Sequence, residues 1–183
     1  MVESSDECLN ENQECKMADS SLKSVTKASE VDTGISDKKR KQVADTLCGA
    51  LADSFTLYLK TLGVHWNVVG PVFFSLHKLT EAQYLDLDEA IDAVAERIRS
   101  LGYEAPASFS DFQSMSAIES SPIPKTAEEM LDVLIADNEA AAKRMREFVS
   151  VADEADDVYT ADMLTARIGK HEENAWMLRS MRS

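Results

Sequence analysis

The chain has 183 residues, of which 44% are hydrophobic and 28% charged, and its formal net charge at pH 7 is −14. This length suits one domain with a sizeable core, and the acidic charge argues against a surface that coats nucleic acid. The longest stretch without a formal charge, 61–77, contains Asn, Gly, Pro and two histidines, so no membrane-spanning helix is expected.

The first 36 residues differ in composition from the rest of the chain. They contain no aromatic residue, and three basic and eight acidic side chains give them a net charge of −5. We predict an acidic, flexible N-terminal tail, which is not a signal peptide because it lacks an apolar core. The three cysteines, Cys8, Cys15 and Cys48, have no metal-site spacing, which favours a reducing cytoplasm.

Two long helices are expected next, separated by a break at Gly70-Pro71. Helical periodicity begins at Ser36, a plausible N-cap, and predicts a first helix that ends near Val68. A second helix is predicted over about residues 72–101, with Gly102 as its stop signal.

The second half of the chain begins with a long connection. Residues 103–125 hold three of the four prolines, and the central segment SDFQSMSAIE is predicted to form a short helix. Thr126 and Glu129 have the spacing of a capping box that starts a third helix, ending near Val151. A fourth helix begins near Asp157. With no strand signal, residues 37–183 are predicted to form an all-α four-helix bundle with a short extra helix in the crossover.

Two of the three histidines, His65 and His77, lie on either side of the predicted helix break. Imidazole together with carboxylate suits iron, zinc or manganese. At 100° per residue, Glu81, Asp92 and Glu96 all fall within about 100° of His77 around the second helix. Asp92 and Glu96 are spaced i, i+4, so their side chains can share a cation.

The acidic pair is nevertheless too far along the helix to meet the histidines of the same chain. Asp92 lies fifteen residues beyond His77, roughly 22 Å along the axis. Two copies of the second helix, packed antiparallel about a twofold axis near residue 85, would bring the opposite ends together. Because such a contact occurs twice, the spacing predicts two equivalent metal sites per dimer, each shared between chains.

Bundles that hold two iron ions within one chain use Glu-x-x-His on paired helices. That motif is absent, because the residues three before the histidines are Leu62, Phe74 and Ile168. The absence favours a shared site. In the alternative interpretation, the histidines cap or pack at the helix break and the carboxylates form a solvated face.

Three segments of the chain resemble the Dps family, the DNA-binding proteins from starved cells, also known as mini-ferritins. They are LYLKTLGVHWNVVGPVFFSLHKL, EAIDAVAERIRSLG and DDVYTADMLTARIGKHEENAWMLRSM. The resemblance covers about residues 40–183 and leaves out the first 36. It implies a ferritin-like fold and a hollow dodecamer of four-helix bundles, with a ferroxidase centre at each twofold interface.

The resemblance also implies a ligand set for iron. By position, His65 and His77 come from one subunit, and Asp92 and Glu96 come from its neighbour. Glu81 stands where many family members have aspartate, and its longer side chain leaves direct ligation of the metal open.

Five further positions carry implied or competing roles. Trp66 matches the aromatic residue beside the centre, which in the family is thought to intercept one-electron oxidising equivalents; packing is the alternative. Asp157 and Asp162 match acidic positions that line threefold pores, and the alternative is a favourable charge at the start of the fourth helix. His171 is expected to be a hydrogen-bonded core residue, and Cys48 to be buried.

The implied reaction is oxidation of Fe²⁺, with hydrogen peroxide as the preferred oxidant, followed by storage of ferric mineral. Two other functions remain in competition. One is a nucleoid-binding protein that protects DNA by association, which the acidic tail disfavours. The other is a zinc- or manganese-binding shell without redox turnover.

Overall fold

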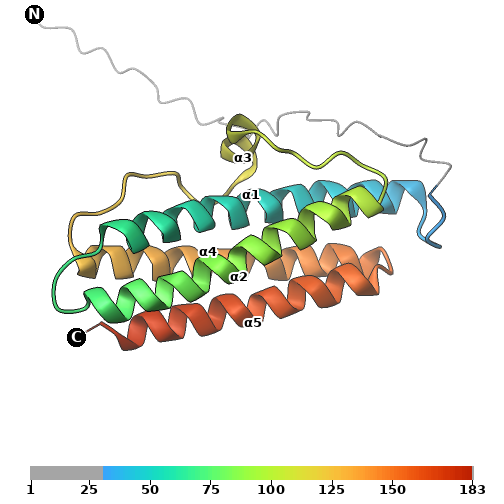
Figure 1. Ribbon diagram of the computed structural model, residues 1–183. Helices are drawn as coiled ribbons and strands as arrows, with labels where there is room; N and C mark the ends of the chain where they lie inside the picture. Colours follow the sequence, from blue (N-terminus) through green and yellow to red (C-terminus); the bar gives the residue numbers. More distant parts are fainter. Residues whose placement is uncertain (1–30, 183) are drawn as a thin grey trace, which may run out of the picture.

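The computed structural model describes residues 31–182, and this part of the chain folds into five α-helices with no β-strand (Figure 1). The helices are α1 (Asp37–Asn67), α2 (Phe73–Ser100), α3 (Phe109–Met115), α4 (Ala127–Glu154) and α5 (Val158–Ser180). The predicted all-α fold, with a short helix in the crossover, is confirmed. Most of the predicted tail, with Cys8 and Cys15, lies outside the described residues.

Local sequence signals account for several helix ends. The Thr126 hydroxyl accepts a hydrogen bond from the Glu129 backbone N–H, and the Glu129 carboxylate accepts one from the Thr126 N–H. This capping box satisfies two otherwise unpaired donors at the start of α4. Gly102 follows α2 with a φ of +93°, a left-handed conformation that glycine adopts without strain and that stops the helix.

The four long helices form two antiparallel pairs, α1 with α2 and α4 with α5, joined by the long crossover (Figure 1). Arg40 near the start of α1 donates to the Leu101 carbonyl oxygen just after the end of α2. α2 and α5 are also antiparallel, because Arg97 pairs with Asp157 at one end and Asp86 pairs with Arg167 nearer the middle.

A buried ion pair fastens the crossover to the bundle. The Arg144 guanidinium lies 2.8 Å from both carboxylate oxygens of Asp53, which is 2% exposed. Asp53 also accepts hydrogen bonds from the Ala117 N–H and the Ser116 hydroxyl, and Arg144 donates to the Met115 carbonyl. The segment after α3 is therefore held by charge-assisted hydrogen bonds to two different helices.

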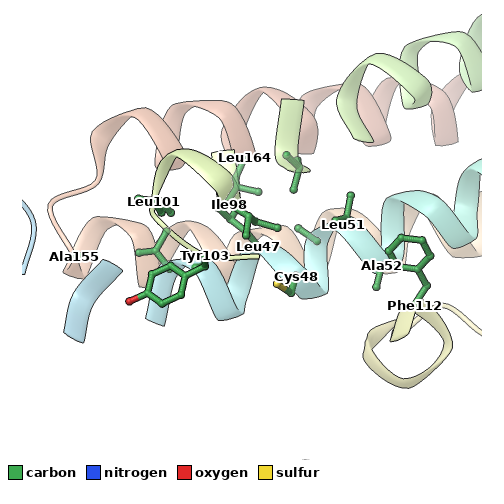
Figure 2. Packing of buried hydrophobic residues seen from close by; sticks show 14 residues of the cluster. Leu47, Cys48, Leu51, Ala52, Ile98, Leu101, Tyr103, Phe112, Ala155 and Leu164 are labelled. Carbon is green, nitrogen blue, oxygen red and sulfur yellow. The ribbon is translucent and has the colours of Figure 1, made fainter. Parts of the chain in front are cut away.

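The apolar core forms two clusters along the bundle. Figure 2 shows the first, which includes Leu47, Leu51, Ile98 and Leu164. The second includes Leu57, Leu76, Leu87, Leu134 and Leu178. Cys48 is buried, as predicted, and belongs to the first cluster; its burial raises the pKa of the thiol to about 12. None of the described helices combines the length and apolar character needed to cross a membrane.

Candidate metal centre

The sharp turn between α1 and α2 brings the two histidines together. α1 ends at Asn67 and α2 begins at Phe73, and Gly70 takes a φ of +96° in the turn between them. Because the two helices then run antiparallel, His65 and His77 become neighbours across the pair. Their rings stack with centroids 3.8 Å apart and an interplanar angle of 17°.

A reciprocal pair of hydrogen bonds orients both rings. The Nδ1–H of His65 donates to the His77 carbonyl oxygen at 2.9 Å, and the Nδ1–H of His77 donates to the His65 carbonyl oxygen at 2.9 Å. A carbonyl oxygen has no hydrogen to give, so the hydrogen must lie on Nδ1 in each ring. In the neutral rings, both Nε2 atoms then carry the lone pair that a metal requires.

Neighbouring side chains restrict the two rings further. Phe73 stacks on His77 with centroids 5.1 Å apart, and Tyr84 packs edge-on against His65 at 5.2 Å. The Thr80 hydroxyl is 3.4 Å from His65 Nδ1 and 3.2 Å from the His77 carbonyl oxygen. His65 is 8% exposed. The pair is therefore organised by contacts within a single chain.

Glu81 lies close to the histidines, one turn beyond His77 on α2. Its pKa lies below the ordinary value, first because Lys78 donates to its carboxylate at 2.7 Å and also because the two histidines are nearby. Its carboxylate is therefore available as an anion, although Lys78 competes for it.

The structure does not bring the acidic pair to the histidines of the same chain. Asp92 and Glu96 are exposed on α2, and the helix is continuous between them and His77. Their separation is therefore the roughly 22 Å expected from the sequence. Among residues 31–182, no group of three or more His, Cys, Asp and Glu side chains is arranged to hold a metal ion. The two histidines are a donor pair that fits iron and needs further ligands.

Trp66 follows His65 but lies on the outer side of α1. Its side chain is 66% exposed. It borders a groove between α1 and the crossover that is also lined by Leu59, Phe109 and Ile123. The aromatic rings that this chain itself packs against the histidines are those of Phe73 and Tyr84.

The two acidic residues at the start of α5 occupy different environments. Asp157 is 2% exposed, and its carboxylate accepts hydrogen bonds from Arg97 at 2.7 and 2.8 Å and from Thr160. Burial raises the pKa of Asp157, but these hydrogen bonds outweigh burial and hold it below the ordinary value. This supports the alternative role at the helix N-terminus. Asp162, in contrast, is exposed.

His171 is a buried core residue, as expected. It is 0% exposed, and its Nδ1 lies 3.0 Å from the Asn138 Oδ1 atom.

Two contacts of the candidate centre were not foreseen from the sequence, those of Thr80 and Tyr84. The position of Thr80 three residues after His77 is a signal that could have identified the first.

Known proteins share both the sequence pattern and the fold. The ferritin-like domain family model matches residues 44–183. An uncharacterised low temperature-induced protein of Nostoc is 41% identical over 153 residues, covering 82% of this chain and 85% of the relative. DNA protection during starvation protein 2 of Bacillus anthracis is 34% identical over 140 residues, covering 76% of this chain and 96% of that relative.

Solved structures agree with these relatives. The crystal structure of a Dps protein from Bacillus brevis has a TM-score of 0.76 and 34% identity, covering 80% of this chain and 98% of that one. The Dps protein of Vibrio cholerae, described as a ferritin-like diiron-carboxylate protein, has a TM-score of 0.74 and 29% identity, covering 78% of this chain and 90% of that one. The chain belongs to the Dps family of ferritin-like mini-ferritins.

Proposed function

We propose that this protein oxidises Fe²⁺ at sites shared between two copies of the chain and stores the ferric product inside a hollow dodecamer. Membership of the ferritin-like diiron-carboxylate superfamily supports iron chemistry in general. The observation that carries the proposal is the histidine pair, His65 and His77, in which both Nδ1 atoms are occupied and both Nε2 atoms are free to bind metal.

In the proposed dimer, α2 of one subunit packs antiparallel against α2 of its neighbour. His65 and His77 of one chain then meet Asp92 and Glu96 of the other, and Glu81 adds a carboxylate from the histidine side. The carboxylates would bridge toward a second iron ion, as in two-metal sites. Since few protein ligands are available per site, water would complete the coordination of that second ion.

Hydrogen peroxide is the proposed oxidant because of its electron count. Peroxide accepts two electrons, and two Fe²⁺ ions supply one each, so the pair reduces it without releasing hydroxyl radical. A single Fe²⁺ ion would supply only one electron. Exposed Asp162 is proposed to attract Fe²⁺ at a threefold pore, where three carboxylates would focus the electric field.

The reaction is tested by loading the protein with Fe²⁺ without oxygen and then adding peroxide in small portions. We expect about two Fe²⁺ ions oxidised per peroxide, with little product in a hydroxyl-radical spin trap. Two results would contradict a paired ferroxidase site and favour a metal-binding shell. One is a hydroxyl radical released for each Fe²⁺ oxidised, and the other is an oxidation rate no faster than that of iron in buffer.

The sharing of sites is tested by complementation between two inactive variants. One variant carries His65→Ala and His77→Ala, and the other carries Asp92→Asn and Glu96→Gln. In a mixed dimer, one of the two sites combines the intact histidines of one variant with the intact carboxylates of the other. Random co-assembly should therefore restore on the order of a quarter of the parental rate. If the ligands belonged to one chain, mixing would restore nothing.

A second candidate function is DNA protection by direct association, which the names of relatives in Bacillus anthracis and Brevibacillus brevis suggest. The formal charge of −14 opposes it, because phosphate binding depends on Lys and Arg. A gel-shift assay at low salt without divalent cations decides the question. We expect no retarded band, and tight binding at neutral pH would reverse the order of the two functions.

A further inference from the structure

Three buried polar side chains form a layer across the centre of the bundle, apart from the histidine pair. Gln83 of α2, Asn138 of α4 and His171 of α5 are 3%, 2% and 0% exposed, respectively. We term these three residues the central polar layer. Buried polar groups in proteins are nearly always hydrogen-bonded, so each of these side chains is expected to have a hydrogen-bond partner.

The hydrogen bonds of Asn138 determine which tautomer His171 adopts. The Asn138 Nδ2 group donates to the Leu134 carbonyl oxygen at 2.8 Å, which fixes the amide orientation. Its Oδ1 atom therefore accepts the Nδ1–H of His171 at 3.0 Å. The Nε2 atom of His171 is left with a lone pair, and within the described residues it is buried without a hydrogen-bond partner.

The amide of Gln83 is in the same situation. Both its Oε1 and its Nε2 atoms are buried without a partner in the described part of the chain. Gln83 also lies at the level of His171. Asp86 and Arg167 pair at 2.8 Å across the antiparallel helices α2 and α5. Gln83 lies one turn back from Asp86 on α2, and His171 lies one turn onward from Arg167 on α5.

We propose that the central polar layer binds one water molecule, which bridges His171 and Gln83. The water donates one hydrogen bond to His171 Nε2. It makes a second hydrogen bond with the Gln83 amide, either by donating to Oε1 or by accepting from Nε2. Internal waters in globular proteins commonly satisfy such groups and make about three hydrogen bonds each. The site therefore takes a neutral, water-sized hydrogen-bonding ligand.

The same chemistry excludes metal cations from the bundle centre. The three side chains of the layer carry no carboxylate, and the carboxylate of nearby Asp86 is paired with Arg167. Burial is the main cause that lowers the pKa of His171 to about 3, and the positive charge of the nearby Arg167 guanidinium lowers it further. Bundles often place metal sites between facing helices, but here the facing groups are two neutral amides, a neutral imidazole and the Asp86–Arg167 ion pair, whose carboxylate is already compensated.

A crystal structure of the full-length protein at about 1.5 Å resolution tests the proposal directly. We expect density for one water within roughly 3.2 Å of both His171 Nε2 and the Gln83 amide. A direct hydrogen bond between the two side chains, or a layer without density, would overturn the proposal. In a crystal soaked with Co²⁺, an anomalous peak in the layer would overturn the exclusion of cations. These results do not depend on ferroxidase activity.

A double-mutant cycle tests the bridge in solution. Gln83→Leu and His171→Phe each remove one anchor of the water, so their effects on the thermal midpoint should not add. The matched control combines Gln83→Leu with Thr160→Val. Thr160 lies eleven residues from His171 on α5, roughly 16 Å away, and these effects should add. Additive shifts in both cycles would show that no ligand couples Gln83 to His171.

Discussion

Acidification should destabilise the folded subunit through His171. Burial lowers the pKa of this ring from 6.5 to about 3, with a further contribution from Arg167. Between these values the unfolded chain binds a proton that the folded ring does not, so stability falls as the pH falls from about 6.5 toward 3. At pH 4.5, two units below the unfolded pKa, the loss is about 2.7 kcal/mol per subunit.

The assay compares the parent with His171→Gln. Glutamine offers an amide N–H to Asn138 Oδ1 but does not titrate, so it removes the proton linkage and keeps a hydrogen-bond donor. Urea unfolding is followed by circular dichroism between pH 7.5 and pH 4.5, at one subunit concentration because assembly affects apparent stability. The carboxylates are common to both proteins, so their contribution cancels in the difference.

Over this range, the parent should lose about 2.7 kcal/mol more unfolding free energy than the variant. Equal losses would refute the reasoning, because they would mean that the ring takes up its proton in the folded state at the same pH as in the unfolded state. A second readout is the pH at which the His171 ring titrates in the native protein. A midpoint near 6 would contradict a buried neutral imidazole.

Three further predictions concern the fold. Asp53→Ala should cost about 3–5 kcal/mol of unfolding free energy, because it leaves Arg144 as an uncompensated charge; Asp45→Ala, on the surface of the same helix, should cost far less, and equal costs would contradict this account. Thr126→Ala should cost about 0.5–2 kcal/mol by removing the cap of α4, and Thr126→Ser should restore most of it, as judged by urea midpoints. Cys48, with its pKa raised to about 12, should resist a thiol reagent at pH 8 until the protein unfolds; rapid labelling of the native protein at this position, located by mass spectrometry, would argue against its burial.

Local signals in the sequence were sufficient to predict most of the fold. The capping box at Thr126 and the stop at Gly102 depend on residues within one helical turn, and both behave as predicted. The proximity of His65 and His77 also follows from local information, because a short turn forces the two helices to return antiparallel. The sequence does not contain a comparable local signal for contacts made across the bundle.

Two features illustrate why the remaining contacts could not be predicted. The role of Asp157 depends on Arg97, which lies sixty residues away in the chain and reaches it only because α2 and α5 pack together. The reciprocal hydrogen bonds of the histidines depend on side-chain rotamers and on rings packed around them, such as Tyr84. Residue spacing identifies candidate ligands, but not the tautomer in which each one is held.

The separation of histidines and acids along α2 has a consequence for how the protein responds to iron supply. If each metal ion is held half by one chain and half by its copy, iron and subunit association are thermodynamically linked. Every ion bound at the proposed site would then act as a cross-link, and it would stabilise the dimer by an amount that grows with the free iron concentration. Subunit association would then be weaker when iron is scarce and stronger when iron is abundant, so the stability of the assembly would depend on the iron concentration.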